Sequence, residues 1–304
     1  MRRRGPRRPA EAVPVVLTDR FSPWPRRLAF RTVAYGLLAL GTIVYLGPFL
    51  VQLATSFKTD AGATANPVSL IPSPVSTAAW EIVAGDNSAY PVPVARWVAN
   101  SFVVTGCVTL GRLLIDSLAG YALARLRFPG RSAVLATVIA VLAVPNIVLL
   151  IPRFLVVNQL GLFNTYAGMV LPLLFDAVGI LLMRAAFQAV PPELEEAARI
   201  DGAGVLRTFW SVVLPLVKPA LVTVTIFSFQ GSWNEFTHFL VATSDPDLAT
   251  LNLGIARLSA GDLAGPTQFP LKLALATLST IPIAVVYIFF SRYFIRFGAT
   301  TGLK

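Results

Sequence analysis

The sequence is poor in the residues that most catalytic and metal centres require. Its 304 residues include one histidine, His238, and one cysteine, Cys107. A zinc, haem or iron–sulfur centre needs several such ligands and a disulfide needs two cysteines, so none of these can form within the chain. A nucleophile–His–acid arrangement would depend on His238 alone, which lies in or beside an apolar segment. We therefore predict no catalytic site and no metal site, and a membrane-bound enzyme is the least favoured class of function.

Charged residues are also scarce. They make up 13% of the chain against 55% hydrophobic residues, and the mean hydropathy is +0.70. A soluble globular domain has about twice that charged fraction. Three apolar stretches contain no charge at all, and they lie between Arg31 and Lys58, between Arg131 and Arg153, and between Lys272 and Arg292. Because a helix needs about 20 apolar residues to cross a bilayer, each stretch predicts a membrane helix.

Three further apolar stretches carry isolated charges. They cover Trp97–Leu123, Thr165–Gln188 and Val212–Phe239. A buried soluble core would require helices with polar faces, and the three uncharged stretches have none. The sequence therefore predicts an all-α polytopic membrane protein with six transmembrane helices.

The basic residues predict the orientation of these helices. With a cytoplasmic N-terminus, 19 of the 25 Lys and Arg residues lie in cytoplasmic segments, as the positive-inside rule requires. Both termini are therefore expected in the cytoplasm. The net charge of +10 first raises the question of nucleic acid. Arg side chains beside anionic membrane lipid account for it equally well, so we expect lipid contact and no nucleic-acid partner.

These assignments divide the chain into five parts. They are a basic cytoplasmic tail (1–30), a first transmembrane helix (31–57), an extracytoplasmic loop (58–96), a five-helix core (97–296) with a cytoplasmic loop at 190–219, and a cytoplasmic C-terminal tail (297–304). The loop at 58–96 is rich in proline and has room for a short amphipathic helix around Trp80. No short apolar segment with a small-residue cleavage site follows the first arginines, so no cleaved signal peptide is expected.

The loop from Pro191 to Pro219 predicts a short helix with defined ends. Pro192 suits the first position of a helix, and Gly202 suits a left-handed end. Glu195 and Arg199 stand four residues apart, so they are expected to pair on the helix surface.

The small pair Ala197 and Ala198 lies within this short helix. Small side chains let another backbone approach closely. The helix is therefore expected to dock into a groove on a partner protein.

The same loop resembles a known family. Glu196-Ala197-Ala198, then Gly202 and Val213-Leu214-Pro215, are similar to the EAA loop of binding-protein-dependent ABC import permeases, in its carbohydrate branch. The resemblance covers about residues 30 to 304. Its further motifs are Asn100-Ser101-Phe102, Tyr121-Ala122-Leu123-Ala124-Arg125, Phe128-Pro129-Gly130, Ile151-Pro152, Leu160-Gly161-Leu162, Trp233-Asn234-Glu235-Phe236 and Gly302-Leu303-Lys304. This ordered set carries the resemblance, since any one short motif would be weak.

The resemblance implies a type I ABC importer permease fold, also called MetI-like, as in the smaller six-span permease of maltose-type systems. It implies a bacterial inner-membrane subunit that translocates a sugar or sugar-like solute. The implied partners are a companion permease in a heterodimer, two ATP-binding cassette subunits and an extracytoplasmic solute-binding protein. In that family the loop helix inserts into a cleft on the ATP-binding subunit. The implied docking residues here are Glu196, Ala197, Ala198, Asp201, Gly202 and Ala203.

The chain has no sequence motif for binding nucleotide itself. A phosphate-cradling loop requires G-x-x-x-x-G-K-[ST], and none of the four lysines stands in that setting. No cofactor is therefore expected in this chain, and the implied ATP and Mg²⁺ would be bound by the partner subunits.

Charges within the apolar stretches are candidates for a translocation path. Arg112 and Asp116 are four residues apart in one predicted span, and Asp176 lies in another with no nearby cation of its own. Intramembrane charges are costly, so they pair or face a cavity. Both interpretations remain open at this point: a polar lining of the path, or a structural ion pair between packed helices. Asp176 requires a partner from another helix or from water.

Trp233, Asn234 and Glu235 are candidates for contact with a sugar. An aromatic face with amide and carboxylate groups suits stacking and hydrogen bonding to a sugar ring. Trp is equally common at membrane interfaces. The polar segment 245–270 is expected to be a flexible outer loop that faces the solute-binding protein.

A second class of function remains as the alternative. A secondary carrier or channel that works alone would also be an apolar multi-helix chain. No internal repeat is evident, which weakens a carrier built from inverted halves.

Overall fold

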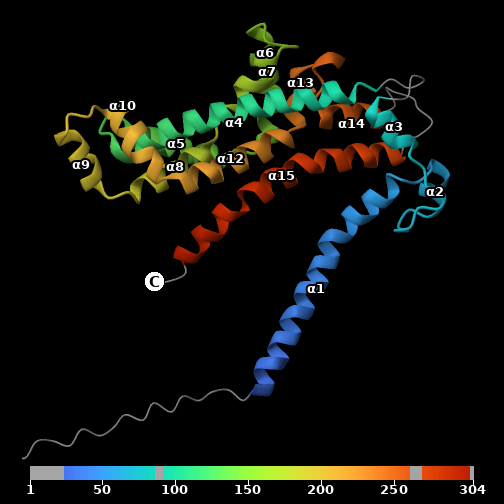
Figure 1. The fold of residues 1–304 in the computed structure, drawn as a ribbon. Helices are drawn as coiled ribbons and strands as arrows, with labels where there is room; N and C mark the ends of the chain where they lie inside the picture. The colour runs from blue at the N-terminus through green and yellow to red at the C-terminus, as the bar shows by residue number, and fades with distance from the viewer. Residues whose placement is uncertain (1–23, 86–91, 261–268, 302–304) are drawn as a thin grey trace, which may run out of the picture. The chain divides into compact units, whose positions relative to one another are not determined.

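The computed structural model describes residues 24–85, 92–260 and 269–301, and over these residues all regular structure is helical (Figure 1). The chain divides into two units, residues 1–48 and 49–304. Most of the predicted N-terminal tail lies outside the described residues. The α-helices are α1 (Trp24–Thr55), α2 (Asp60–Ala65), α3 (Ala78–Ala84), α4 (Val94–Arg125), α5 (Arg131–Val141), α6 (Leu150–Gln159), α7 (Tyr166–Val170), α8 (Ala177–Gln188), α9 (Pro192–Ile200), α10 (Val205–Thr208), α11 (Leu214–Leu216), α12 (Lys218–Trp233), α13 (Thr237–Ala242), α14 (Leu251–Ala260) and α15 (Phe269–Thr301).

Four short helices of other types connect these elements. Three are 3₁₀-helices and one is a π-helix: η1 (Asn146–Leu149), η2 (Leu171–Leu173), η4 (Pro246–Leu248) and the π-helix η3 (Phe209–Val213).

The helices match the six predicted spans. Three single helices are long and apolar enough to cross a membrane, over Phe30–Thr55, Val94–Arg125 and Phe269–Phe290. Three bent pairs pass the same test, and the count is six when each pair is one span. The pairs are Arg131–Val141 with Asn146–Gln159, Tyr166–Leu173 with Ala177–Gln188, and Val205–Leu216 with Lys218–Trp233.

The bends correct the expectation of unbroken spans. The stretch from Arg131 to Arg153 was predicted as one helix. The chain instead bends by 101° between the helical parts Arg131–Val141 and Asn146–Gln159. Pro145 lies in the break; proline has no N–H to donate and disfavours helical geometry in the residue before it. The pair around Val217 bends by 84°, and Pro219 lies in the first turn of the helix that follows the bend. A proline therefore lies at or next to each of these two sharpest bends.

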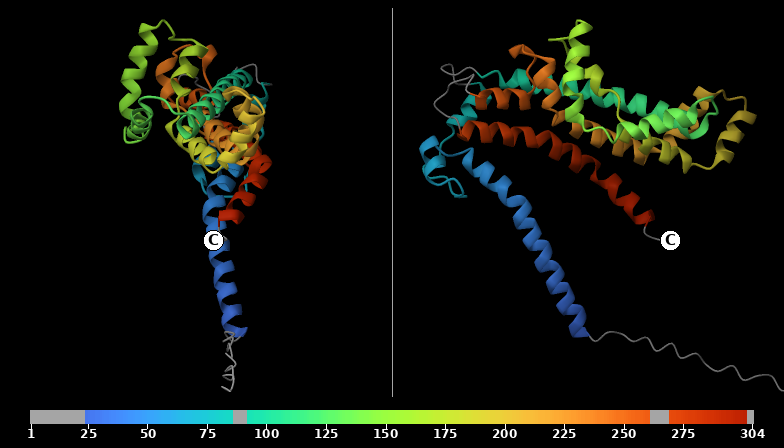
Figure 2. Two further views of the ribbon diagram at one scale, coloured as in Figure 1. Left: turned by 90° about the vertical axis from the view of Figure 1, so that its left-hand side faces the viewer. Right: turned by 180° about the vertical axis from the view of Figure 1, so that it is seen from behind.

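Helix α4 is the central element of the larger unit. It packs against α8 along one side and against α12, and α12 packs on α15 (Figures 1 and 2). The approach to α8 is close because α4 has a glycine there. A Cβ atom on Gly120 would lie 2.7 Å from the Cβ of Met183 and 2.9 Å from the backbone nitrogen of Arg184.

Two segments outside the spans contain short helices. The predicted helix around Trp80 is present as α3, with Ala79 and Ile82 buried and Glu81 exposed. The segment 245–270 was predicted to be flexible, and this is wrong over its first part, because it contains η4 and α14. Leu253 and Leu258 of α14 are buried. Helix α14 therefore packs its apolar side chains against the core.

The last helix continues beyond the predicted end of the core. Helix α15 extends to Thr301, whereas the tail was expected to begin at residue 297. The boundary at 296 therefore falls inside a helix.

Candidate functional site

Helix α9 has the predicted form of a docking element. Pro192 occupies its first turn, and Gly202 follows its end with φ +81°. A side chain on Gly202 would meet no atom within 4 Å. The glycine is therefore required by its left-handed backbone and not by lack of space.

The six implied docking residues differ in exposure. Glu196, Ala197, Asp201 and Gly202 are exposed, Ala203 is partly buried, and Ala198 is only 9% exposed. The methyl group of Ala198 therefore faces the chain itself, while the other positions remain accessible.

Exposed apolar side chains accompany these residues. The loop bears Ile200 at 87% exposure, Leu206 at 67% and Trp210 at 51%. Sequence reasoning on small residues and glycine did not single them out. Large apolar residues in a segment that is otherwise rich in charge could have indicated an interaction surface from the sequence.

Glu195 corrects the predicted surface pairing. It is 4% exposed, and its Oε1 lies 2.9 Å from Nε of Arg125 at the end of α4. The expected partner, Arg199, is exposed on the helix surface. The spacing of four residues was correct for a surface pair, but tertiary contact with α4 outweighed it.

A hollow of about 560 Å³ lies beside α9. Charged side chains from the end of α4, the segment after it, the start of α5 and α9 line it: Arg125, Arg127, Arg131, Glu195, Glu196 and Arg199. The docking helix therefore borders a strongly polar recess.

A second polar site lies where the spans bend. A cavity of about 270 Å³ brings together three of the predicted path residues, Arg112, Asp176 and Glu235. Sequence reasoning missed two further polar residues of the lining, Asn146 and Arg153. Asn146 begins η1 directly after the break at Pro145, so only the bend places it here.

Arg112 connects α4 to the start of α8. Its Nη1 lies 3.6 Å from Oδ2 of Asp176, and its Nε donates to the carbonyl of Leu173 at 2.6 Å. Asp176 caps α8, because its Oδ1 accepts from the N–H of Val178 at 3.1 Å. Of the two partners expected for Asp176, another helix or water, the structure shows the first, because Arg112 belongs to α4.

Asp116 lies beside this pair without lining the cavity. Its side chain is fully buried, and within the described part of the chain neither oxygen has a hydrogen-bond partner. Its carboxylate occupies the position that a side chain on Gly179 would need. The ion pair of Arg112 is thus made with Asp176 and not with Asp116.

The Trp233-Asn234-Glu235 segment is divided by the fold. Trp233 is 3% exposed, stacks on Phe229 at 5.7 Å between ring centroids, and donates from Nε1 to the carbonyl of Ser279 at 2.9 Å. Asn234 is exposed and does not line the cavity. Glu235 does line it, and its Oε1 accepts from the N–H of His238 at 2.8 Å.

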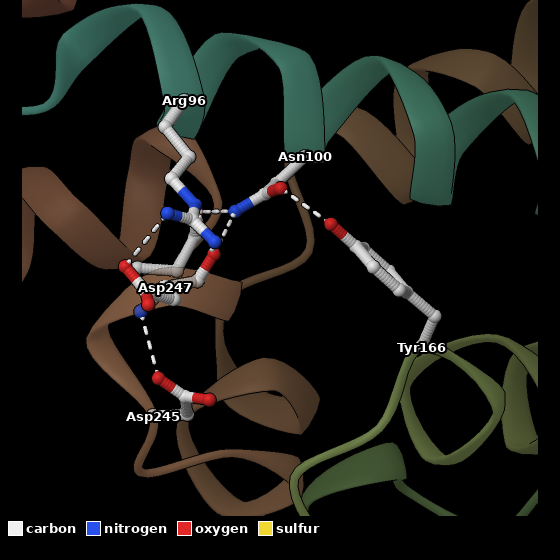
Figure 3. Close-up of polar contacts among 6 residues, drawn as sticks. Arg96, Asn100, Tyr166, Asp245 and Asp247 are labelled. Atoms are coloured by element: carbon white, nitrogen blue, oxygen red, sulfur yellow. Dashed lines mark hydrogen bonds and ion pairs between the residues drawn. The ribbon is translucent and has the colours of Figure 1, made fainter.

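A polar cluster near the start of α4 holds the segment around η4 (Figure 3). Arg96 Nη1 lies 3.0 Å from Oδ1 of Asp247, and Asn100 Nδ2 donates to the carbonyls of Asp247 at 2.8 Å and Ala249 at 2.9 Å. Tyr166 of α7 donates to Oδ1 of Asn100 at 2.6 Å. In the sequence, Asn100 stood out only as part of the Asn100-Ser101-Phe102 motif. In the structure, this residue of α4 bonds both η4 and α7.

Metal binding has no candidate among the described residues. Over the described ranges, no three His, Cys, Asp or Glu side chains gather in a way that could hold an ion.

Comparison with known proteins places this arrangement in a family. Residues 116–297 match the family described as "Binding-protein-dependent transport system inner membrane component". The sn-glycerol-3-phosphate transport system permease protein of Yersinia pestis is 33% identical over 264 residues, which cover 86% of this chain and 92% of that protein. The protein of the same description from Agrobacterium fabrum is 30% identical over 269 residues, covering 88% of this chain and 95% of that one.

Solved structures agree with these matches. A chain of a bacterial ABC transporter involved in the import of the acidic polysaccharide alginate aligns with a TM-score of 0.76 and 26% identity, covering 90% of this chain and 99% of that one. A chain of the alginate transporter in complex with its alginate-bound periplasmic protein aligns with a TM-score of 0.60 at 15% identity, which shows the fold alone. The predicted fold and the predicted family are confirmed. The chain belongs to the inner membrane components of binding-protein-dependent transport systems, and it is a permease subunit of an ABC importer.

Proposed function

We propose that this chain imports a sugar or sugar-like solute as one half of a heterodimeric channel. Its partners are a companion permease, two ATP-binding cassette subunits and an extracytoplasmic solute-binding protein. The similar permeases named for sn-glycerol-3-phosphate and the transporter for alginate support this class of solute. The chain itself catalyses no reaction, and ATP with its Mg²⁺ binds in the partner subunits.

The observation that carries this proposal is the docking loop. Helix α9 presents the exposed Glu196 and ends at the left-handed Gly202, and exposed apolar side chains follow it. Burial of such apolar surface in a groove is the usual source of affinity between proteins. We assign Glu196, Ala197, Ala198, Asp201, Gly202 and Ala203 to this interface, with Ala198 setting the helix against its own chain.

The orientation follows from the charges. With the loop at 190–219 and both termini in the cytoplasm, the basic residues lie on the side that anionic lipid favours. The opposite end then carries η4, which Asn100 of α4 holds through the carbonyl of Asp247, and α14, whose first N–H bonds Ser101 of α4. We assign that end to contact with the solute-binding protein.

The polar cavity is the candidate wall of the translocation path. Arg112, Asp176 and Glu235 line it, and the buried Asp116 is not part of the lining. Trp233 supports the wall from the core and Asn234 lies outside the cavity, so neither is assigned direct contact with the solute.

Replacing Asp176 by asparagine tests this assignment. The change removes the partner of Arg112 and alters a group on the cavity wall, so we expect uptake with at least a fivefold higher KM and unchanged amounts of the chain in the membrane. Uptake kinetics and quantitative immunoblots measure the two effects. A purely structural pair would behave differently: the amount of chain would fall with uptake, and the double variant Arg112→Gln/Asp176→Asn would restore both.

Reconstitution separates an importer subunit from a carrier that works alone. Proteoliposomes that hold this chain alone are expected to show no uptake above empty vesicles. Adding the companion permease, the ATPase subunits, the binding protein and ATP should give uptake that stops when ATP is omitted. Uptake by the chain alone would favour the secondary carrier or channel instead.

A further inference from the structure

Arg125 joins the docking helix to two membrane helices. It is the last residue of α4, and its Nε lies 2.9 Å from Oε1 of Glu195 in α9. Its Nη2 donates to the carbonyl of Phe187 in α8 at 2.7 Å, and also to the carbonyl of Val190. One guanidinium group therefore contacts α8, α9 and the short segment between them.

Tyr121 completes the environment of Glu195. It stands one turn before Arg125 on α4, and its hydroxyl donates to Oε2 of Glu195 at 3.3 Å. Its ring packs on Phe187 of α8 and Phe209 of η3, with centroids 5.6 Å and 5.1 Å apart. Both oxygens of Glu195 thus contact side chains of α4, and the same two residues contact α8 before the loop and η3 within it.

The burial of this pair makes it a strong constraint. The side chains of Arg125 and Glu195 are 15% and 5% exposed. A buried carboxylate without its partner is costly, so removing one member of a buried pair is strongly unfavourable. The planar guanidinium fork can bond a carboxylate and carbonyls together, which an ammonium group cannot do with the same geometry.

The two neighbouring glutamates of α9 have opposite environments. Glu195 points into its own chain, and Glu196 is exposed. A force applied to the exposed side of α9 would therefore reach α4 through Glu195, one residue away.

The far end of α8 has a matching contact. Arg112 of α4 pairs with Asp176 at the start of α8, and Arg125 of α4 bonds Phe187 at its end. These two arginines are 13 positions apart, which corresponds to about 20 Å along a helix. Arginines of α4 thus hold α8 at both of its ends, so the two helices are linked from the docking loop to the polar cavity.

From this geometry we infer that the Arg125–Glu195 pair transmits movement of the docking helix to α4 and α8, and through them to the cavity. This inference rests on the proposed function, because it requires an ATPase subunit on α9. Arg125 and Glu195 are positioning residues: they touch neither the solute nor ATP. Without the pair, α9 still binds the ATPase, but its movement no longer moves the membrane helices.

The experiment compares Glu195→Gln with Glu193→Gln in the reconstituted complete transporter. Glu193 is an exposed glutamate of the same helix, so it controls for loss of one charge. We measure three quantities: co-purification of the ATPase subunits, ATP hydrolysis, and solute transported per ATP hydrolysed. Glu195→Gln is expected to retain co-purification and hydrolysis and to lower the transport-to-ATP ratio at least fivefold, while Glu193→Gln keeps the ratio of the natural chain.

A double-variant comparison tests the pair itself. Arg125→Gln with Glu195→Gln should lower the ratio no further than either single change, because both remove one connection. Should Glu195→Gln not accumulate in the membrane, Arg125→Lys retains the charge and loses the fork, and the ratio is still expected to fall.

Two results would overturn the inference. One is an unchanged transport-to-ATP ratio in the variants of the pair. The other is loss of ATPase co-purification in Glu195→Gln, which would place Glu195 in the docking surface. Failure of the proposed function would look different, since the natural chain itself would then show no ATP-dependent uptake.

Discussion

Replacing Glu196 by lysine is expected to abolish uptake while the chain remains in the membrane at its normal level. Glu196 is exposed on the docking helix, so the change costs no packing within the chain. A groove that accepts a carboxylate repels an ammonium group, and wrong-sign charge in an interface costs several kcal/mol. A loss of about 3 kcal/mol weakens ATPase binding about a hundredfold.

Uptake assays and co-purification of the ATPase subunits measure this effect. Glu81→Lys is the matched control, because Glu81 is an exposed glutamate of a short helix outside the loop. It undergoes the same charge reversal and should retain uptake. Normal co-purification together with normal uptake in Glu196→Lys would remove Glu196 from the docking interface.

Replacing Gly120 by valine is expected to destabilise the folded chain by about 3 kcal/mol, the upper part of the range for overpacking. Even the Cβ atom of the new side chain would lie 2.7 Å from the Cβ of Met183 and 2.9 Å from the backbone nitrogen of Arg184. Backbone atoms cannot turn away as the end of a side chain can, so α4 and α8 must separate. The change should also disturb the neighbouring Tyr121 and the pair that it supports.

Thermal unfolding of the purified chain in detergent measures this prediction. Gly106→Val provides the control on the same helix, because a Cβ there meets nothing within 4 Å. We expect a clear fall in the midpoint for Gly120→Val and a small change for Gly106→Val, which reflects only helix propensity. Equal shifts in the two variants would contradict close packing of α4 on α8.

Much of the architecture was predictable because the membrane imposes simple rules on the sequence. Spans must be about 20 apolar residues long, and backbone groups must be bonded within the helix. These rules gave six spans. The end of the docking helix at Gly202 was predictable for a local reason, because a left-handed turn strongly favours glycine.

The partners of side chains were much less predictable. The spacing of Glu195 and Arg199 suggested a surface pair, yet Arg125, seventy residues earlier, takes that place. Asp176 needed a partner from another helix or from water, and the sequence alone could not choose between water and the several arginines. Such pairings depend on how helices pack, which a pattern along one helix does not contain.

The sequence also failed to predict which residues near the bends line the cavity. Trp233 had the chemistry for contact with a sugar, but packing against Phe229 placed it in the core. Asn146 reached the cavity because the chain turns sharply near Pro145. Sequence periodicity describes straight helices well, so residues beside a break are where it fails.

The composition of the cavity wall has a consequence for selectivity. Two arginines, Arg112 and Arg153, face two carboxylates, Asp176 and Glu235. Opposite charges in equal number leave little long-range field, and such a field is what draws or repels charged solutes at a distance. As a wall of the proposed path, this lining is expected to discriminate solutes mainly through short-range hydrogen bonds.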